Sequence, residues 1–216
     1  MKVAASLLAS DFARLGEEVE RVSRSGADFI HVDVMDGFFV RNITMGSDII
    51  KAIRPYASIP FDVHLMITEP SRYFADFAGA GADIITFHAE AGSNLLSAIN
   101  AVKSTGKKVG VAIKPTTLVD ELLEYLPMID LAVVMTVEPG FGGQAFMPEM
   151  MGKVRVLREE IRRLRLETQI EVDGGINKET AKMAAQSGAD ICVAGTSIFK
   201  SSDMKEAIGD LKQIKL

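Results

Sequence analysis

A five-residue motif that occurs three times constrains the fold of this chain more than any other feature. Glycine, alanine and aspartate are followed each time by two apolar residues, at positions 26–30, 81–85 and 188–192. A glycine suits the end of a helix, where the chain turns left-handed, and the apolar residues then begin a short buried strand. The motifs lie 55 and 107 residues apart, which is two and four times a unit of about 27 residues. A chain of 216 residues therefore holds eight such units.

The remaining units can be located by their apolar runs and helical patterns. The runs predict buried strands at 3–8, 29–34, 61–65, 84–87, 109–113, 131–137, 170–172 and 191–194. Amphipathic patterns between them predict helices, among them 12–25, 70–79, 95–104 and 178–186. Buried strands that alternate with helices indicate an α/β protein with a parallel sheet, and eight βα units predict a (β/α)8 TIM barrel.

A doubly wound open sheet is the alternative fold. It is disfavoured because no Gly-x-Gly-x-x-Gly turn follows the first predicted strand. No Ser/Pro-rich linker divides the chain. We therefore expect residues 1–216 to form one barrel domain.

Charge and composition exclude several classes of protein. Hydrophobic residues make up 48% of the chain and charged residues 25%, so a disordered or fibrous protein is excluded. The net charge of −5 argues against nucleic acid as the main partner, because phosphate binding leaves a basic surface. The single cysteine, Cys192, excludes an internal disulfide and suits a reducing cytoplasm. No apolar run approaches the roughly 20 residues of a membrane span.

The apolar start of the chain briefly imitates a signal peptide. It is too short for one, and Asp11 interrupts it, so we interpret it as a buried first strand. We expect a cytoplasmic protein that binds a small molecule, has no nucleic-acid or membrane partner, and forms a homo-oligomer.

All three histidines of the chain lie within or at the end of a predicted strand. His31 and Asp33 are two residues apart, so both point to one face of their strand, which in a barrel is the interior. His64 and Asp173 would point to the same place from the third and seventh strands. Two imidazoles and two carboxylates form a four-ligand site for one divalent ion such as Zn²⁺, Fe²⁺, Mn²⁺ or Co²⁺. The alternative is four separate polar residues that each satisfy loop backbone groups.

Five other side chains lie at the same strand ends. His88 and Asp36 are candidates for supporting the metal ligands, and a plain structural role is the alternative. Met35, Met66 and Met135 each lie at or just past the end of a strand. Methionines usually fill a core, but three at one barrel mouth could form an apolar floor beside the reacting carbons.

Glycines cluster in the loops that follow three successive strands. Glycine allows the backbone to approach a ligand closely, and N–H groups at turns and helix starts can surround an anion. Barrels often bind phosphate at the loops after strands seven and eight. The sequence therefore predicts a phosphate site formed by Gly140, Phe141, Gly142 and Gly143, by Gly174 and Gly175, and by Gly195 and Thr196.

At these residues the sequence closely resembles the ribulose-phosphate 3-epimerase family. The matching segments span nearly the whole chain in the family's order. They are Ser-Leu-Leu at 6–8, His-Val-Asp-Val-Met-Asp-Gly at 31–37, His-Leu-Met at 64–66, Met-Thr-Val-Glu-Pro-Gly-Phe-Gly-Gly-Gln at 135–144, Glu-Val-Asp-Gly-Gly at 171–175 and Gly-Thr-Ser at 195–197.

The resemblance implies a ribulose-phosphate-binding (β/α)8 barrel with one divalent metal held by His31, Asp33, His64 and Asp173. It implies Asp33 and Asp173 as the acid/base pair, Ser6 and His64 as substrate contacts, and the glycine loops as the phosphate site. The family interconverts D-ribulose 5-phosphate and D-xylulose 5-phosphate. The expected reaction is proton transfer at C3 by two carboxylates, through a metal-stabilised enediolate.

The sequence departs from the family pattern in three places. Ala5 stands where the family usually has proline, and 8–11 reads Leu-Ala-Ser-Asp where it usually reads Leu-Ser-Ala-Asp. After Gly37 the family commonly has His-Phe-Val-Pro-Asn, whereas this chain has Phe-Phe-Val-Arg-Asn at 38–42. In this loop Phe38 replaces histidine, and Arg41 adds charge where proline would stiffen the chain.

Three other functions compete with this interpretation. A D-allulose-6-phosphate 3-epimerase would share the metal site and differ around the sugar. A decarboxylase of the orotidine-phosphate type usually carries Asp-x-Lys-x-x-Asp after a strand, which this chain lacks. A non-catalytic sugar-phosphate binder would not need two carboxylates beside the reacting carbon.

Overall fold

The computed structural model describes residues 1–92 and 94–215. Its strands are β1 (Lys2–Ser6), β2 (Phe29–Met35), β3 (Phe61–Met66), β4 (Ile84–His88), β5 (Lys108–Ile113), β6 (Leu131–Met135), β7 (Gln169–Asp173) and β8 (Ile191–Ala194). Its α-helices are α1 (Leu15–Ser25), α2 (Ser47–Ile53), α3 (Phe74–Ala80), α4 (Leu95–Ser104), α5 (Asp120–Leu123), α6 (Met151–Leu164), α7 (Lys178–Ser187), α8 (Thr196–Phe199) and α9 (Met204–Lys212). Short 3₁₀ turns lie at Leu7–Ala9, Phe12–Arg14, Arg54–Tyr56, Pro70–Arg72, Leu126–Met128 and Pro148–Met150.

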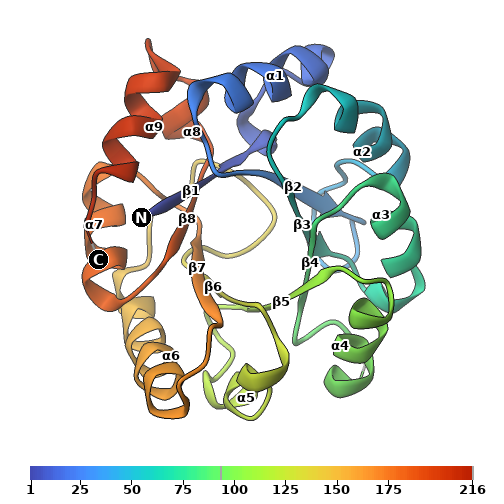
Figure 1. Ribbon diagram of the computed structural model, residues 1–216, viewed down its shortest axis with the longest axis vertical. Coiled ribbons are helices and arrows are strands. Elements are labelled where there is room, and N and C mark those ends of the chain that lie inside the picture. The colour runs from blue at the N-terminus through green and yellow to red at the C-terminus, as the bar shows by residue number, and fades with distance from the viewer. Residues whose placement is uncertain (93, 216) are drawn as a thin grey trace.

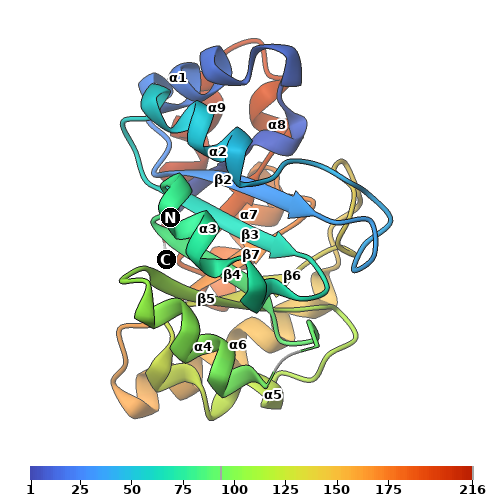
Figure 2. The ribbon, with the colours of Figure 1, turned by 90° about the vertical axis from the view of Figure 1, so that its right-hand side faces the viewer.

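The strands form a closed parallel barrel in the order in which they follow one another along the chain. Each strand pairs with the next, and β1 pairs with β8 through a register that aligns Lys2 with Ile191. The helices lie in a ring outside the strands (Figure 1). Because the strands are parallel, their carboxyl ends lie at one end of the barrel, as β2 and β3 show in side view (Figure 2). The predicted (β/α)8 TIM barrel is confirmed.

The repeated motif performs the same two tasks each time it occurs. Its glycine ends a helix in the left-handed conformation, with φ of 91° at Gly26, 109° at Gly81 and 106° at Gly188. Its aspartate accepts a hydrogen bond from the backbone N–H of the first or second residue of the preceding strand. These bonds join Val3 to Asp28, Phe61 to Asp83 and Ile170 to Asp190 at 2.8–2.9 Å.

The motif precedes β2, β4 and β8, which explains the spacing of two and four units. Before β6 the glycine and alanine are missing, but Asp130 still accepts a hydrogen bond from the N–H of Val109 in β5. The aspartates therefore tie the strands together in consecutive pairs at the amino end of the barrel.

Four predicted elements were too long, including the helix predicted at 70–79, whose first residues form a 3₁₀ turn before α3 begins at Phe74. The first strand ends at Ser6 rather than residue 8, because the Ser6 hydroxyl accepts a hydrogen bond from Leu8 N–H and starts a 3₁₀ turn. The sixth strand ends at Met135 rather than residue 137; beyond it the Thr136 hydroxyl donates to the carbonyl of Gly174 in the next loop. The helix predicted at 12–25 is interrupted at its start by a 3₁₀ turn that Asp11 caps.

The barrel interior combines apolar and polar layers. Small and branched residues fill one part of it, including Ala4, Ala112, Val133 and Val193. A second part is polar and fully buried, and its side chains come from β2, β3, β4 and β7. Among the described helices, none is long and apolar enough to cross a membrane.

Candidate functional site

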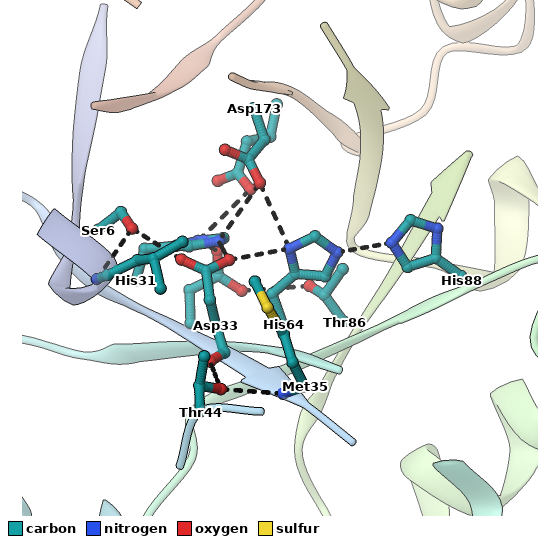
Figure 3. Close-up of polar contacts among 12 residues, drawn as sticks. Ser6, His31, Asp33, Met35, Thr44, His64, Thr86, His88 and Asp173 are labelled. Carbon is teal, nitrogen blue, oxygen red and sulfur yellow. Dashed lines mark hydrogen bonds and ion pairs between the residues drawn. The ribbon is translucent and has the colours of Figure 1, made fainter. Parts of the chain in front are cut away.

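Four predicted residues converge in the barrel interior, near the carboxyl ends of their strands (Figure 3). His31 and Asp33 come from β2, His64 from β3 and Asp173 from the end of β7. His31 Nε2 lies 3.4 Å from Asp33 Oδ1 and 3.6 Å from Asp173 Oδ2. His64 Nδ1 lies 3.5 Å and 3.3 Å from the same two oxygens. The structure therefore places two nitrogens and two oxygens around one point.

This arrangement fits a divalent metal ion by three criteria. Ligands held about 2.0–2.1 Å from a tetrahedral ion lie about 3.3–3.4 Å from one another, which is close to the separations found here. Within the described part of the chain, His31 Nε2 and His64 Nδ1 are buried without a hydrogen-bond partner. Such orphaned atoms are costly unless something binds them. The donor set of two imidazoles and two carboxylates suits borderline divalent ions.

The electrostatics of the cluster follow from burial and mutual attraction. Burial disfavours ionisation of Asp33, but the adjacent His31 and His64 outweigh it and hold the pKa of Asp33 well below its usual range. Burial likewise opposes a charge on His31, yet Asp33 and Asp62 raise its pKa well above 6.5. The pKa of His64 is raised as well, because attraction to the nearby carboxylates of Asp173 and Asp33 outweighs burial. In the metal-free cluster, the neighbouring carboxylates therefore favour a positive charge on these histidines.

Unlike the nitrogens that face the carboxylates, the other ring nitrogen of His31 and of His64 does have a partner. His31 Nδ1 lies 2.9 Å from Asp62 Oδ2, and the Thr86 hydroxyl donates to the other oxygen of Asp62 at 3.1 Å. His64 Nε2 lies 3.0 Å from His88 Nε2 (Figure 3). These contacts orient both rings, as outer partners do in metal sites. His88, which was left with two possible roles, contacts the cluster directly.

Two buried carboxyls beside the cluster were missed by the sequence analysis. Asp62 lies two residues before His64, and Glu171 lies two residues before Asp173, so each shares the inward face of its strand. The same spacing that paired His31 with Asp33 could have identified them. Both Glu171 oxygens are buried, with no hydrogen-bond partner among the described residues. Burial and the negative charge of Asp62 raise the pKa of Glu171 well above its usual range.

A cavity of about 320 Å³ opens above the cluster at the carboxyl end of the barrel. The fully buried His31 and His64 lie below its lining, whereas Asp33 and Asp173 form part of it. All the other predicted site residues line the cavity as well. They are Ser6, Met35, Met66, Met135, Gly140, Phe141, Gly142, Gly143, Gly174, Gly175, Gly195 and Thr196. The Ser6 hydroxyl donates to Asp33 Oδ2 at 2.7 Å.

The methionines occupy two different environments. Met35 and Met66 pack with Val40 from the loop after β2. Met135 packs with the apolar interior of the barrel. They contribute to one cavity wall but do not form a single cluster.

Two glycines after β7 leave no room for a side chain. Gly174 has φ of 120°, and a Cβ there would lie 2.4 Å from Val137 Cγ2. Gly175 has φ of 66°, and a Cβ there would lie 2.6 Å from the backbone nitrogen of Phe146. Both the backbone conformation and the close approach of the neighbouring loop therefore require glycine.

Asp36 has a structural role outside the cluster. One of its oxygens accepts hydrogen bonds from the N–H groups of Phe38 and Phe39, and the other accepts one from Thr68 N–H. It thereby ties the loop after β2 to the loop after β3. In the loop after β2, the side chain of Phe38 is 89% exposed, and Arg41 is exposed too.

Comparisons with known proteins agree with this geometry. The model of the ribulose-phosphate 3-epimerase family matches residues 2–199. A protein named ribulose-phosphate 3-epimerase from Bacillus subtilis is 47% identical over the full length of both chains. Another of that name from Candida glabrata is 48% identical, covering 98% of this chain and 91% of the relative.

More distant solved structures share the fold alone. A 3-hexulose-6-phosphate synthase from Salmonella typhimurium superposes with a TM-score of 0.70 at 22% identity, covering 99% of this chain and 98% of that one. An orotidine 5'-phosphate decarboxylase from Pyrococcus horikoshii superposes with a TM-score of 0.66 at 17% identity, covering 97% and 96%.

Proposed function

The chain belongs to the ribulose-phosphate 3-epimerase family, and from that premise we propose that it is a metal-dependent enzyme that inverts C3 of D-ribulose 5-phosphate to give D-xylulose 5-phosphate. The observation that carries the proposal is the convergence of His31, Asp33, His64 and Asp173 below a cavity of about 320 Å³. A volume of a few hundred Å³ is typical of sites for small metabolites.

The proposed cofactor is one divalent ion, Zn²⁺, Fe²⁺, Mn²⁺ or Co²⁺, held by these four side chains. His31 would contribute Nε2 and His64 would contribute Nδ1, the two nitrogens that otherwise lack partners among the described residues. When bound, such an ion supplies Lewis-acid stabilisation of negative charge on the substrate oxygens.

Asp33 and Asp173 are the proposed acid and base. They come from β2 and β7 and face each other across the cluster, so a substrate carbon between them would meet one carboxyl on each face (Figure 3). One carboxylate removes the C3 proton and keeps it, and the other carboxyl donates its own proton to the opposite face of C3. The two groups exchange protonation states in one turnover and exchange roles in the reverse reaction. The Ser6 hydroxyl holds Asp33 in place for this task.

The phosphate is proposed to bind at the glycine loops after β6, β7 and β8. Gly143, Gly175 and Thr196 all line the cavity, and backbone without a side chain can approach an anion closely. A fixed phosphate would hold C3 between the two carboxyls and so make proton transfer effectively intramolecular. Backbone N–H groups would bind this anion without a basic surface, which accords with the net charge of −5.

The test is an assay of D-ribulose 5-phosphate and D-allulose 6-phosphate on a single sample whose metal content is measured. We expect turnover of the first sugar with the higher kcat/KM, and deuterium from heavy water at C3 of the product. A preference for the second sugar would assign the allulose-phosphate reaction instead. Binding of both sugars without deuterium exchange would refute catalysis, and full turnover by metal-free enzyme would refute the metal requirement.

A further inference from the structure

The side chains of His88 and Glu90 lie in a row beyond His64, on the side of its ring that faces away from Asp33 and Asp173. His88, the last residue of β4, approaches His64 with the two Nε2 atoms 3.0 Å apart (Figure 3). The two rings are nearly parallel, with an angle of 21° between their planes. On its far side, His88 Nδ1 lies 3.2 Å from Glu90 Oε2. The three side chains form a continuous line from the cluster to the loop after β4.

The direction of the hydrogen bonds along this line is set at its outer end. Glu90 Oε1 accepts a hydrogen bond from Lys114 N–H at 2.7 Å and another from the Thr117 hydroxyl. Burial alone would raise the pKa of Glu90, but the hydrogen bonds from His88, Thr117 and Lys114 outweigh it and lower the pKa to about 2. Glu90 is therefore an ionised carboxylate at neutral pH, and an ionised carboxylate can only accept.

The loop that supplies these donors is itself fixed. The ammonium group of Lys153 in α6 donates to the carbonyls of Lys114, Pro115 and Thr117. The position of Glu90 is thus coupled to a helix of the outer ring. The contact between Glu90 and His88 is therefore held in place by the surrounding structure.

Each step inward then follows from the one before. His88 Nδ1 must carry the proton that it donates to Glu90. A neutral His88 has one N–H and one lone pair, so its Nε2 accepts. His64 Nε2 must therefore carry a proton and donate it to His88. A neutral His64 with its proton on Nε2 has its lone pair on Nδ1, the atom that faces Asp33 and Asp173.

We infer that Glu90 is a positioning residue that acts through His88 to keep the lone pair of His64 on Nδ1, the nitrogen that faces the proposed metal site. The inference rests on the proposed metal site, and it identifies the side chains that determine which nitrogen of His64 faces the metal as a ligand. Without them, a neutral His64 could hold its proton on Nδ1 and could not bind a metal through that atom. His31 has the corresponding contact in one step, since Asp62 meets its Nδ1 directly and leaves Nε2 for the metal.

The first test is the protonation pattern of the histidine rings, measured by nitrogen NMR on the ¹⁵N-labelled chain. The chain has only three histidines, so the ring signals can be assigned with one histidine variant for each. We expect His88 to carry its proton on Nδ1 in both the metal-free and the Zn²⁺-loaded protein, and loaded His64 to carry its proton on Nε2. A proton on Nε2 of His88 would overturn the inference.

The second test compares the Zn²⁺ affinity of Glu90→Gln, His88→Phe and Thr117→Val by competition with a chelator. In Glu90→Gln, one of the two carboxylate oxygens becomes an amide N–H group, which would face either His88 or the N–H of Lys114 and could not accept a hydrogen bond there. In His88→Phe, an aromatic ring remains but forms no hydrogen bond. Both should weaken Zn²⁺ binding about 10–100-fold, the usual effect of losing an outer partner. Thr117→Val is the matched control, because it removes one hydrogen bond to Glu90 and leaves the His88 contact intact.

Melting temperatures of the metal-free variants separate positioning from general destabilisation. Equal Zn²⁺ affinity in all four proteins would refute the inference, as would a loss in Thr117→Val as large as that in Glu90→Gln. Should a variant fail to fold, the NMR result on the unmodified chain still decides. Failure of the unmodified chain to bind Zn²⁺, Fe²⁺, Mn²⁺ or Co²⁺ would refute the metal site itself. The position of the proton on His88 separately tests the direction of the hydrogen bonds from His64 to His88 and from His88 to Glu90.

Discussion

Replacing Glu171 with glutamine should stabilise the metal-free protein, by an amount that grows with pH. In the folded chain, the buried Glu171 keeps its proton far above the usual pKa of 4.5, whereas in the unfolded chain it releases the proton near that value. Between these two pKa values the folded state binds one more proton, so the wild-type protein loses stability as the pH rises. Glutamine has almost the same shape, does not ionise, and lacks this dependence.

The expected size follows from one proton. The stability difference between Glu171→Gln and the wild type should increase by about 1.4 kcal/mol for each pH unit above pH 5, until Glu171 ionises in the folded chain. Urea unfolding in the presence of a chelator at pH 5, 6 and 7 measures it. Glu17→Gln on the exposed face of α1 is the matched control, for which we expect a change within about 0.5 kcal/mol at every pH. A Glu171→Gln difference that stays constant with pH would refute the reasoning.

Three further predictions concern the site. Asp33→Asn and Asp173→Asn should each lower deuterium exchange at C3 by about 10²–10⁴-fold with an unchanged circular dichroism spectrum, and near wild-type exchange in either would contradict the acid/base assignment. Zn²⁺ should bind more tightly as the pH rises from 6 to 8, because protons must leave His31 and His64, whose pKa values are raised above 6.5. Competition with a chelator measures the Kd for Zn²⁺ at each pH, and a Kd that stays constant would disprove this prediction. Gly174→Ala should destabilise the protein by about 2–5 kcal/mol through backbone strain and the contact with Val137, whereas Gly152→Ala in α6 should be neutral or stabilising in the same urea unfolding experiment.

The sequence predicted the barrel well because its local signals and its packing agree. The helix predicted at 95–104 has the bounds of α4, and in the structure the Asn94 side chain caps its first turn. The first strand was overextended because an apolar run does not show where a side chain begins to bind backbone. Ser6 ends that strand by accepting a hydrogen bond from Leu8 N–H, and leucine is apolar whether it extends a strand or begins a turn.

The convergence of His31, Asp33, His64 and Asp173 could be predicted because alternation along a strand fixes which side chains point inward. The neighbouring hydrogen-bond line could not be predicted in the same way. Glu90 lies beyond the end of β4, and its partners Lys114 and Thr117 follow β5, where no period relates position to direction. Which nitrogen of His88 faces His64 depends on the rotation of the ring, and the sequence contains no signal for that.

The pairing of β1 with β8 has a consequence for how the protein matures. During synthesis the first three proposed ligands leave the ribosome with β2 and β3, but Asp173 emerges 109 residues after His64. The strand that closes the barrel onto β1 emerges later still. A nascent chain that ends before Asp173 therefore lacks one of the four proposed donors, and the set becomes complete only when seven of the eight strands have been synthesised. An ion that needs all four of these side chains would therefore bind late in synthesis or after it.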